Sequence, residues 1–209
     1  MMVPQCQKKE GLRGRVVPII VGIVFAVLLA ITGFNFFYQS KSYSTELITQ
    51  DLKLLQDKFL LIDKQCKIIG FDYQKNPINF LNVGSFEGSE VGPMNLAYPT
   101  KWQGPYVEKN PTQQGLEYQI VRTKKGYFIT PGDGVMLPND KTIGKDIVFD
   151  ENADIEALMK DGGVLQFKGH ALAVPLHLQT GVWQKVIQEL ADEPVEVGMA
   201  SQDTPVQMS

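Results

Sequence analysis

The residues from 16 to 40 carry no charged side chain, and a helical pattern of apolar residues follows them directly. This uncharged run of 25 residues exceeds the roughly 18 residues that a membrane-spanning helix needs. At ~1.5 Å per residue, positions 16–37 cover about 33 Å, close to the thickness of one hydrocarbon core. We therefore predict a transmembrane helix at 16–37, preceded by a short leader at 1–15.

The apolar positions beyond this span are separated by steps of three and four, as on one face of a helix. They are Ile48, Leu52, Leu55, Phe59, Ile62, Cys66 and Ile69. No Pro or Gly interrupts the chain between Asn35 and Ile69, and Gly70 is a suitable C-cap, so we predict one helix over 16–69. Four further leucines widen the apolar face: Leu47, Leu54, Leu60 and Leu61. A face this broad favours packing against a sheet over a two-helix seam.

The charges on the two sides of the span differ. Positive residues gather before it, namely Lys8, Lys9, Arg13 and Arg15, against Glu10 alone. The positive-inside rule therefore predicts a cytoplasmic N-terminus and an exported domain. A cleaved signal peptide is the alternative, but its apolar region is normally about 7–15 residues and ends at a small-residue site. Here the run is longer and ends in Phe36, Phe37 and Tyr38, which favours an uncleaved anchor.

The rest of the chain favours antiparallel strands with short helices. Between 70 and 110, Gly and Pro punctuate a stretch that also contains many aromatic residues, so we expect a structured loop. We predict strands at 116–123, 127–130, 146–149, 164–168 and 171–178, and helices at 154–159 and 182–191. Strands 116–123 and 127–130 form one hairpin, and 164–168 and 171–178 form another. The fold class is therefore α+β, with the exported domain at 38–191 and a disordered tail at 192–209.

This architecture, a transmembrane helix that continues into a small antiparallel sheet, resembles the type IV pilins and the type II secretion pseudopilins. One local stretch, with Trp102, Gly104, Pro105 and Tyr106, looks like the W-x-G-P-Y segment of major pseudopilins. Another, ending in Gly132, Asp133 and Gly134, is similar to the hairpin of that family. The similarity covers roughly 15–135. It implies a structural, membrane-anchored subunit of a type II secretion or pilus-like assembly, with its domain in the periplasm or outside the cell.

The chain departs from the family at the processing signal. Prepilins carry Gly-(Phe/Met)-x-x-x-Glu before the apolar helix, and Gly14 stands in the expected place. However, Arg15 replaces Phe or Met, and Ile19 replaces the glutamate. In the family that glutamate offsets a neighbouring subunit's terminal amine inside the membrane, where an unpaired charge is costly. A second function therefore stays open: a non-polymerising, single-pass anchored domain that acts as a binder or scaffold in the periplasm.

Calcium is the one cofactor that the resemblance implies, because major pseudopilins hold this ion with loop oxygens near the end of the sheet. The candidates by position are Asp133, Asn139, Asp140 and Asp146. Turn-forming Asp and Asn residues explain the same positions without an ion. The stretch 150–154 begins like an EF-hand loop, but Ile155 and Asp161 stand where Gly and Glu are needed. We interpret Asp154 instead as a helix N-cap.

The sequence shows no catalytic motif. It contains no G-x-S-x-G, H-E-x-x-H, C-x-x-C or phosphate loop, so we predict that the protein is not an enzyme. A net charge of −3 argues against nucleic-acid binding. Cys6 and Cys66 fall on opposite sides of the predicted membrane and cannot pair, and Cys66 is expected in the core. The expected partners are membrane lipid and either other pilin-like subunits or inner-membrane proteins of a secretion system.

Overall fold

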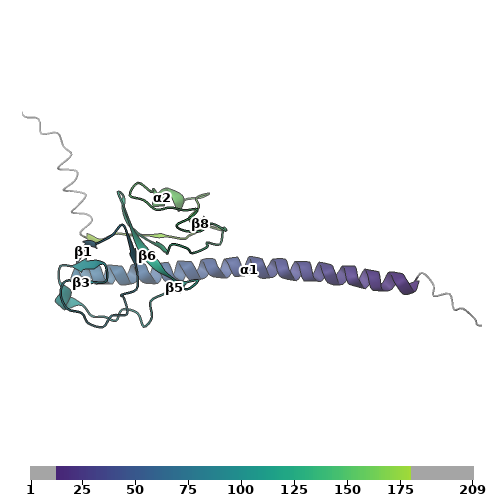
Figure 1. The fold of residues 1–209 in the computed structure, drawn as a ribbon, viewed down its shortest axis with the longest axis horizontal. Coiled ribbons are helices and arrows are strands. Elements are labelled where there is room, and N and C mark those ends of the chain that lie inside the picture. The colour runs from purple at the N-terminus through teal and green to yellow at the C-terminus, as the bar shows by residue number, and fades with distance from the viewer. Residues whose placement is uncertain (1–12, 180–209) are drawn as a thin grey trace, which may run out of the picture.

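The computed structural model describes residues 13–179, with side chains from position 18 onward. In chain order the elements are α1 (Arg13–Cys66), β1 (Ile68–Phe71), β2 (Lys75–Pro77), β3 (Glu90–Val91), β4 (Met94–Leu96), the short 3₁₀ helix η1 (Pro99–Lys101), β5 (Thr112–Gln113), β6 (Leu116–Thr123), β7 (Gly126–Pro131), α2 (Ile155–Leu158), β8 (Gln166–Phe167), β9 (His170–Ala171) and β10 (Val174–Leu176). The strands gather around the C-terminal part of α1, while its N-terminal part projects alone (Figure 1). The predicted α+β arrangement is confirmed.

The long helix is continuous, as the apolar pattern predicted. α1 runs for 54 residues, and its apolar N-terminal part has no contact with the domain. An 18-residue window there has a mean hydropathy of 2.5, and none of it is buried. This is the one helix in the described part of the chain that is long and apolar enough to cross a membrane. Length and composition fit a membrane anchor or a signal sequence.

The C-terminal end of α1 differs from the prediction. The helix ends at Cys66, because Lys67 adopts a left-handed backbone with φ of 52°. The Asp63 carboxylate then accepts the Ile68 N–H at 3.0 Å, which satisfies a backbone donor just past the helix. Ile69 therefore lies in β1 and is 52% exposed, so its assignment to the helix packing face was wrong. The expected cap at Gly70 was wrong for the same reason.

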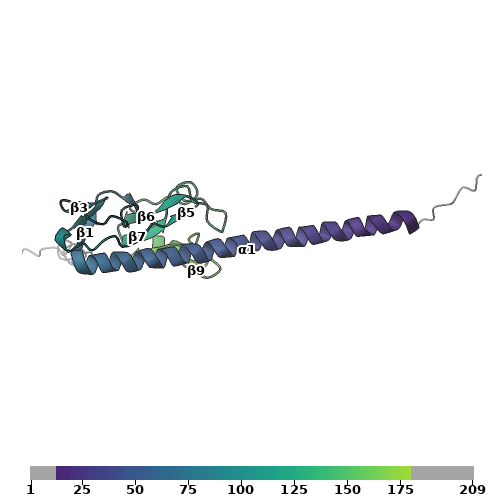
Figure 2. The ribbon, with the colours of Figure 1, turned by 90° about the horizontal axis from the view of Figure 1, so that it is seen from below.

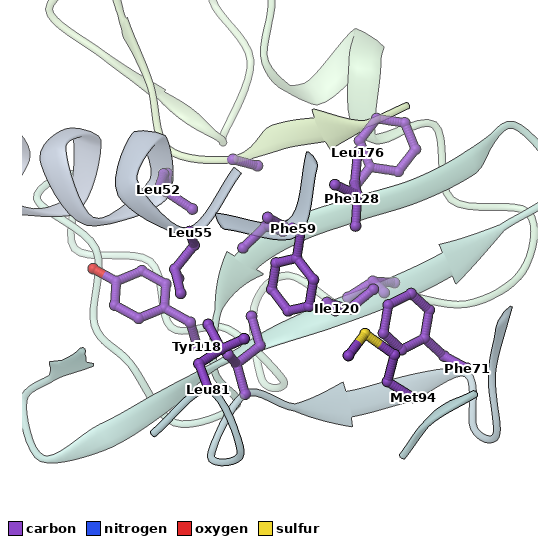
Figure 3. Packing of buried hydrophobic residues seen from close by; sticks show 14 of the residues in the cluster. Leu52, Leu55, Phe59, Phe71, Leu81, Met94, Tyr118, Ile120, Phe128 and Leu176 are labelled. Atoms are coloured by element: carbon purple, nitrogen blue, oxygen red, sulfur yellow. The ribbon is translucent and has the colours of Figure 1, made fainter. Parts of the chain in front are cut away.

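The other six predicted packing residues are fully buried: Ile48, Leu52, Leu55, Phe59, Ile62 and Cys66. Phe59 makes edge-to-face contacts with the rings of Phe71 and Phe80, each at a centroid distance of 6.1 Å. Figure 3 shows Leu52, Leu55 and Phe59 pointing from the helix into the same cluster as side chains of the sheet. One face of α1 is thus the inner support of the domain, which confirms that part of the prediction.

The additional leucines do not widen the face that packs on the sheet, and that interpretation was wrong. Leu54, Leu60 and Leu61 are 41%, 40% and 39% exposed. Because each helical residue turns by about 100°, positions 54 and 61 point about 120–140° away from the centre of the buried stripe. Figure 2 shows most strands lying on one side of α1, so the sheet does not reach those leucines.

The main sheet has the strand order β10-β7-β6-β2, and β5 also pairs with β6. The predicted hairpin is confirmed as β6 and β7, whose register runs from Tyr118 opposite Pro131 to Thr123 opposite Gly126. A second sheet, β1-β4-β3, lies within the stretch expected as a loop. That expectation was incomplete, because residues 68–96 form short strands that pair with one another or, for β2, with β6.

The remaining predictions had mixed outcomes. The short helix is confirmed as α2, and Asp154 caps it by accepting the Ala157 N–H at 3.1 Å. The predicted strand at 146–149 was wrong, since Ile147 forms only a single bridge with Ile143. The second hairpin is shorter than expected: β8 pairs with β9, and β10 pairs with β7 instead. The predicted helix at 182–191 and the tail at 192–209 lie outside the described residues.

The buried and exposed leucines of α1 allow a paired test of this packing. Leu55→Ala should lower the free energy of unfolding by about 2–5 kcal/mol, because it leaves a cavity against the sheet. Leu54→Ala should change it by no more than about 0.5 kcal/mol, because that side chain is exposed and lies outside the core cluster. Urea unfolding of the detergent-purified chain, followed by circular dichroism, measures both. Equal losses in the two variants would contradict the assigned orientation of α1.

Candidate functional site

One side of α1 carries apolar residues that lie outside the fully buried stripe. Leu47, Leu54 and Leu61 recur every seven residues and therefore share one side of the helix. We call these three residues the leucine stripe. Leu47 is half-buried, whereas the other two are exposed. Tyr43 and Phe36, both exposed, continue the same side toward and into the apolar segment. The sequence contained this spacing, but we expected these leucines to widen the face that the sheet covers.

The W-x-G-P-Y segment holds the loop around it onto the C-terminal end of α1. Trp102 donates its Nε1–H to the carbonyl of Val83 at 3.1 Å and stacks edge-on with Tyr106 at 4.7 Å. The Tyr106 hydroxyl donates to Oε1 of Gln65, in the last turn of α1, at 3.0 Å. The Gly104–Pro105 peptide bond is cis. These contacts bring the motif residues together as packing.

Gly104 is a position where the segment admits no side chain. A Cβ there would lie 2.2 Å from the Val83 carbonyl oxygen, whereas a Cβ at Gly84 would meet only Pro105 at 3.9 Å. Gly104→Ala should therefore lower the free energy of unfolding by about 1–3 kcal/mol, and Gly84→Ala should leave it nearly unchanged. Thermal unfolding of the two variants gives the comparison. A neutral Gly104→Ala would mean that the Trp102 segment is loosely packed.

The Gly132-Asp133-Gly134 turn is fixed to two strands. A Cβ at Gly132 would lie 2.1 Å from the Glu117 carbonyl oxygen, and Gly134 has a φ of +94°. The Asp133 carboxylate accepts hydrogen bonds from Lys75 Nζ at 2.8 Å and from Gln119 Nε2 at 3.2 Å. The turn therefore needs both glycines for close backbone approach and for its left-handed conformation.

The four calcium candidates do not form one centre. Besides Asp133, which pairs with Lys75, Asp140 pairs with Lys41 at 2.6 Å. Asp146 accepts the Thr142 N–H at 2.8 Å, and Asn139 donates to the Val164 carbonyl at 2.8 Å. Among the residues that the structure describes, no group of three or more His, Cys, Asp or Glu side chains could hold a metal ion. The geometry favours turn formation as the role of all four.

A partly buried polar contact joins the sheet to α1. Tyr118 of β6 is fully buried and donates its hydroxyl to Oδ2 of Asp51 at 2.9 Å. Burial raises the pKa of Asp51, and the hydrogen bond from Tyr118 partly opposes this rise. Burial likewise raises the pKa of the Cys66 thiol, which is therefore a protonated core group at neutral pH. Nothing in the apolar spacing pointed to Asp51, since a lone carboxylate in a helix resembles a solvated residue.

The Asp51 contact predicts a pH dependence of stability. Because the folded-state pKa lies above the ordinary value of 3.8, folding favours the protonated acid. The stability that the protonated Asp51 contributes is present below pH 3.8, and it is lost as the pH rises from 3.8 through the raised pKa of the folded state. Asp51→Asn should weaken this fall and keep an oxygen that accepts from Tyr118. Asp51→Ala should cost about 1–3 kcal/mol relative to Asp51→Asn at neutral pH, because it leaves the buried hydroxyl unpaired.

Denaturant titrations of the three proteins across the acidic to neutral range measure these differences. A pH dependence in Asp51→Asn as steep as in the unmodified chain would exclude Asp51 as its source.

Comparisons with known proteins do not assign this chain to a family. No protein-family model, curated protein or solved structure matches this chain. The pilin-like character therefore consists of the architecture itself, a long N-terminal apolar helix whose second half packs against antiparallel sheets.

Proposed function

We propose that this protein is a membrane-anchored, pilin-like subunit of a type II secretion or type IV pilus-like envelope assembly, and that its role is structural. The leucine stripe carries the proposal. Lipid can cover the apolar span, but the stripe continues beyond the span, where Leu54 and Leu61 stay exposed. Leucines that recur along one side of a helix outside the bilayer are a seam that a partner helix can pack against. Neighbouring copies of the helix, or inner-membrane proteins of the secretion system, fit that face best.

The proposed topology places the N-terminus in the cytoplasm and the domain in the periplasm or outside the cell. The positive residues before the span support this orientation. The anchor then crosses the cytoplasmic membrane once. The net charge of −3 argues against nucleic acid as a partner.

A second function, an anchored binder or scaffold that does not polymerise, is favoured by one observation. Position 19 holds Ile19, where fibre-forming pilins carry an intramembrane glutamate. Gly14 and Arg15 lie in the first turn of α1, and their processing stays a prediction. Intact-mass measurement of the native protein distinguishes the two functions. Cleavage after Gly14 with a modified new terminus supports a fibre subunit, and an intact Met1 end with single-protomer size supports the anchored binder.

Two equally exposed leucines allow a direct test of assembly through the stripe. Leu54 lies on the stripe and Leu60 lies off it, and their side chains are 41% and 40% exposed, respectively. Each position is replaced in turn by a photo-crosslinking amino acid. We expect irradiation of native membranes to give a ladder of multiples of the chain mass from position 54. Position 60 should give little product.

Leu54→Glu combined with Leu61→Glu should abolish that ladder when the crosslinker stands at position 47, because it places charges in an apolar contact. Monomer alone from both positions 54 and 60 would defeat the assembly proposal and leave the anchored binder.

A further inference from the structure

The described part of the chain ends at a defined place beside α1. β10 contacts the helix, and Gln56 donates to the Pro175 carbonyl at 2.7 Å. The Asp63 carboxylate, which is 1% exposed, then accepts the Gln179 N–H at 2.7 Å. The backbone of Gln179 is helical, and a carboxylate that accepts such an N–H stabilises the start of a helix. The residues after 179 therefore start on the side of α1 that carries Gln56 and Asp63.

The leucine stripe lies on the opposite side of α1. Each helical residue turns by about 100°, so Leu54 points about 160° away from Gln56 and about 180° away from Asp63. By the same rule, Leu61 points about 160° away from Asp63. The width of the helix, about 10 Å with its side chains, thus separates the point where the described chain ends from the stripe of the same molecule.

Neither way around α1 gives the following residues an easy path to their own stripe. Tyr98 donates its backbone N–H to the Cys66 carbonyl at 2.8 Å, which places the loop after β4 against the last residue of the helix. The outward surface of α1, between the two sides, carries the exposed residues Lys53, Asp57 and Lys64. Charged side chains are a poor surface for an apolar helix face to pack on.

The segment that follows needs an apolar surface. The helix predicted at 182–191 has 10 residues, and helices shorter than about 12–15 residues are marginal in water unless they pack on something. Its apolar side chains fall within an arc of about 140° around the helix. They are Val182, Trp183, Val186, Ile187 and Leu190.

The segment and the exposed part of the stripe match in length. A helix over 182–191 is about 15 Å long, and Leu54 lies about 10 Å from Leu61 along α1. One such helix therefore covers both exposed leucines. Leu47, which is half-buried, lies nearer the apolar span and stays available to a neighbouring α1.

We propose that residues 182–191 of one copy pack on Leu54 and Leu61 of the next copy. This inference rests on the proposed assembly and names the partner of the exposed leucines within it. Each subunit then carries the two halves of the contact on opposite sides of α1. A contact of this kind is heterologous, so its repetition adds subunits in a series, and two copies do not satisfy each other as a closed pair.

The peptide that becomes joined to position 54 tests the assignment. Native membranes that contain the full chain with a photo-crosslinking amino acid at position 54 are irradiated, and the band of twice the chain mass is digested and analysed by mass spectrometry. We expect the crosslinked peptide to contain residues 182–191. A ladder whose crosslinked peptides come from the neighbour's α1 would overturn the assignment and leave the proposed assembly intact. Absence of any ladder would defeat both.

Two substitutions within the segment give a matched pair. Val186→Glu places a charge on the predicted apolar face, and Gln188→Glu places the same charge about 160° away. Glutamate favours helices, so neither change should disrupt the predicted helix. Val186→Glu should lower the yield of the two-chain product from position 54 on the order of tenfold, and Gln188→Glu should leave it unchanged. Equal yields from the two variants would overturn the assignment.

The segment of the same molecule is the alternative occupant of α1, and Leu60 distinguishes it. Leu60 is 40% exposed and points about 60° away from Asp63, toward the side on which the described chain ends. A crosslinker at position 60 should not reach residues 182–191. A product of single-chain mass that joins position 60 to this segment would show that the segment folds back on its own helix, and it would overturn the assignment.

Discussion

The fold depends on one helix that is suited to two environments. Within α1 each turn satisfies its own backbone hydrogen bonds, which is the condition for crossing lipid. The same rod then supplies six fully buried side chains to the domain core, between Ile48 and Cys66. That face lies in one cluster with buried side chains of β6 and β7, among them Tyr118, Ile120 and Phe128. The helix and the sheets therefore share one core, which fixes the position of the domain relative to the apolar span.

Polar contacts between α1 and the rest of the domain fix the rotation of the helix about its own axis. Asp51 accepts from Tyr118, Gln56 donates to the Pro175 carbonyl at 2.7 Å, and Asp63 accepts the Gln179 N–H at 2.7 Å. Apolar packing is tolerant of small rotations, whereas these three bonds are lost if α1 turns about its axis. They act at three heights along the buried half of the helix. The outward direction of the leucine stripe is a consequence of this fixed rotation.

The sequence predicted what periodicity and local chemistry encode. The continuous helix, the buried stripe, the β6–β7 hairpin and the Asp154 cap all follow from spacing or from short-range hydrogen bonding. It did not predict the end of α1, because the Asp63 side chain replaces the expected glycine. It did not predict β1, β3 and β4 either, since strands of two to four residues form only through their neighbours. The outward leucines were misassigned because apolar spacing does not say what covers a face.

The length of the leucine stripe bears on how partner helices can meet. A strict seven-residue repeat drifts by about 20° per heptad around a straight α-helix. From Leu47 to Leu61 the stripe spans two heptads, so the drift is about 40°, well inside the roughly 100° width of an apolar face. Straight helices can therefore contact along the whole stripe without winding into a supercoil. In the proposed assembly, each domain would stay fixed to its own helix and lie on the side away from the shared seam.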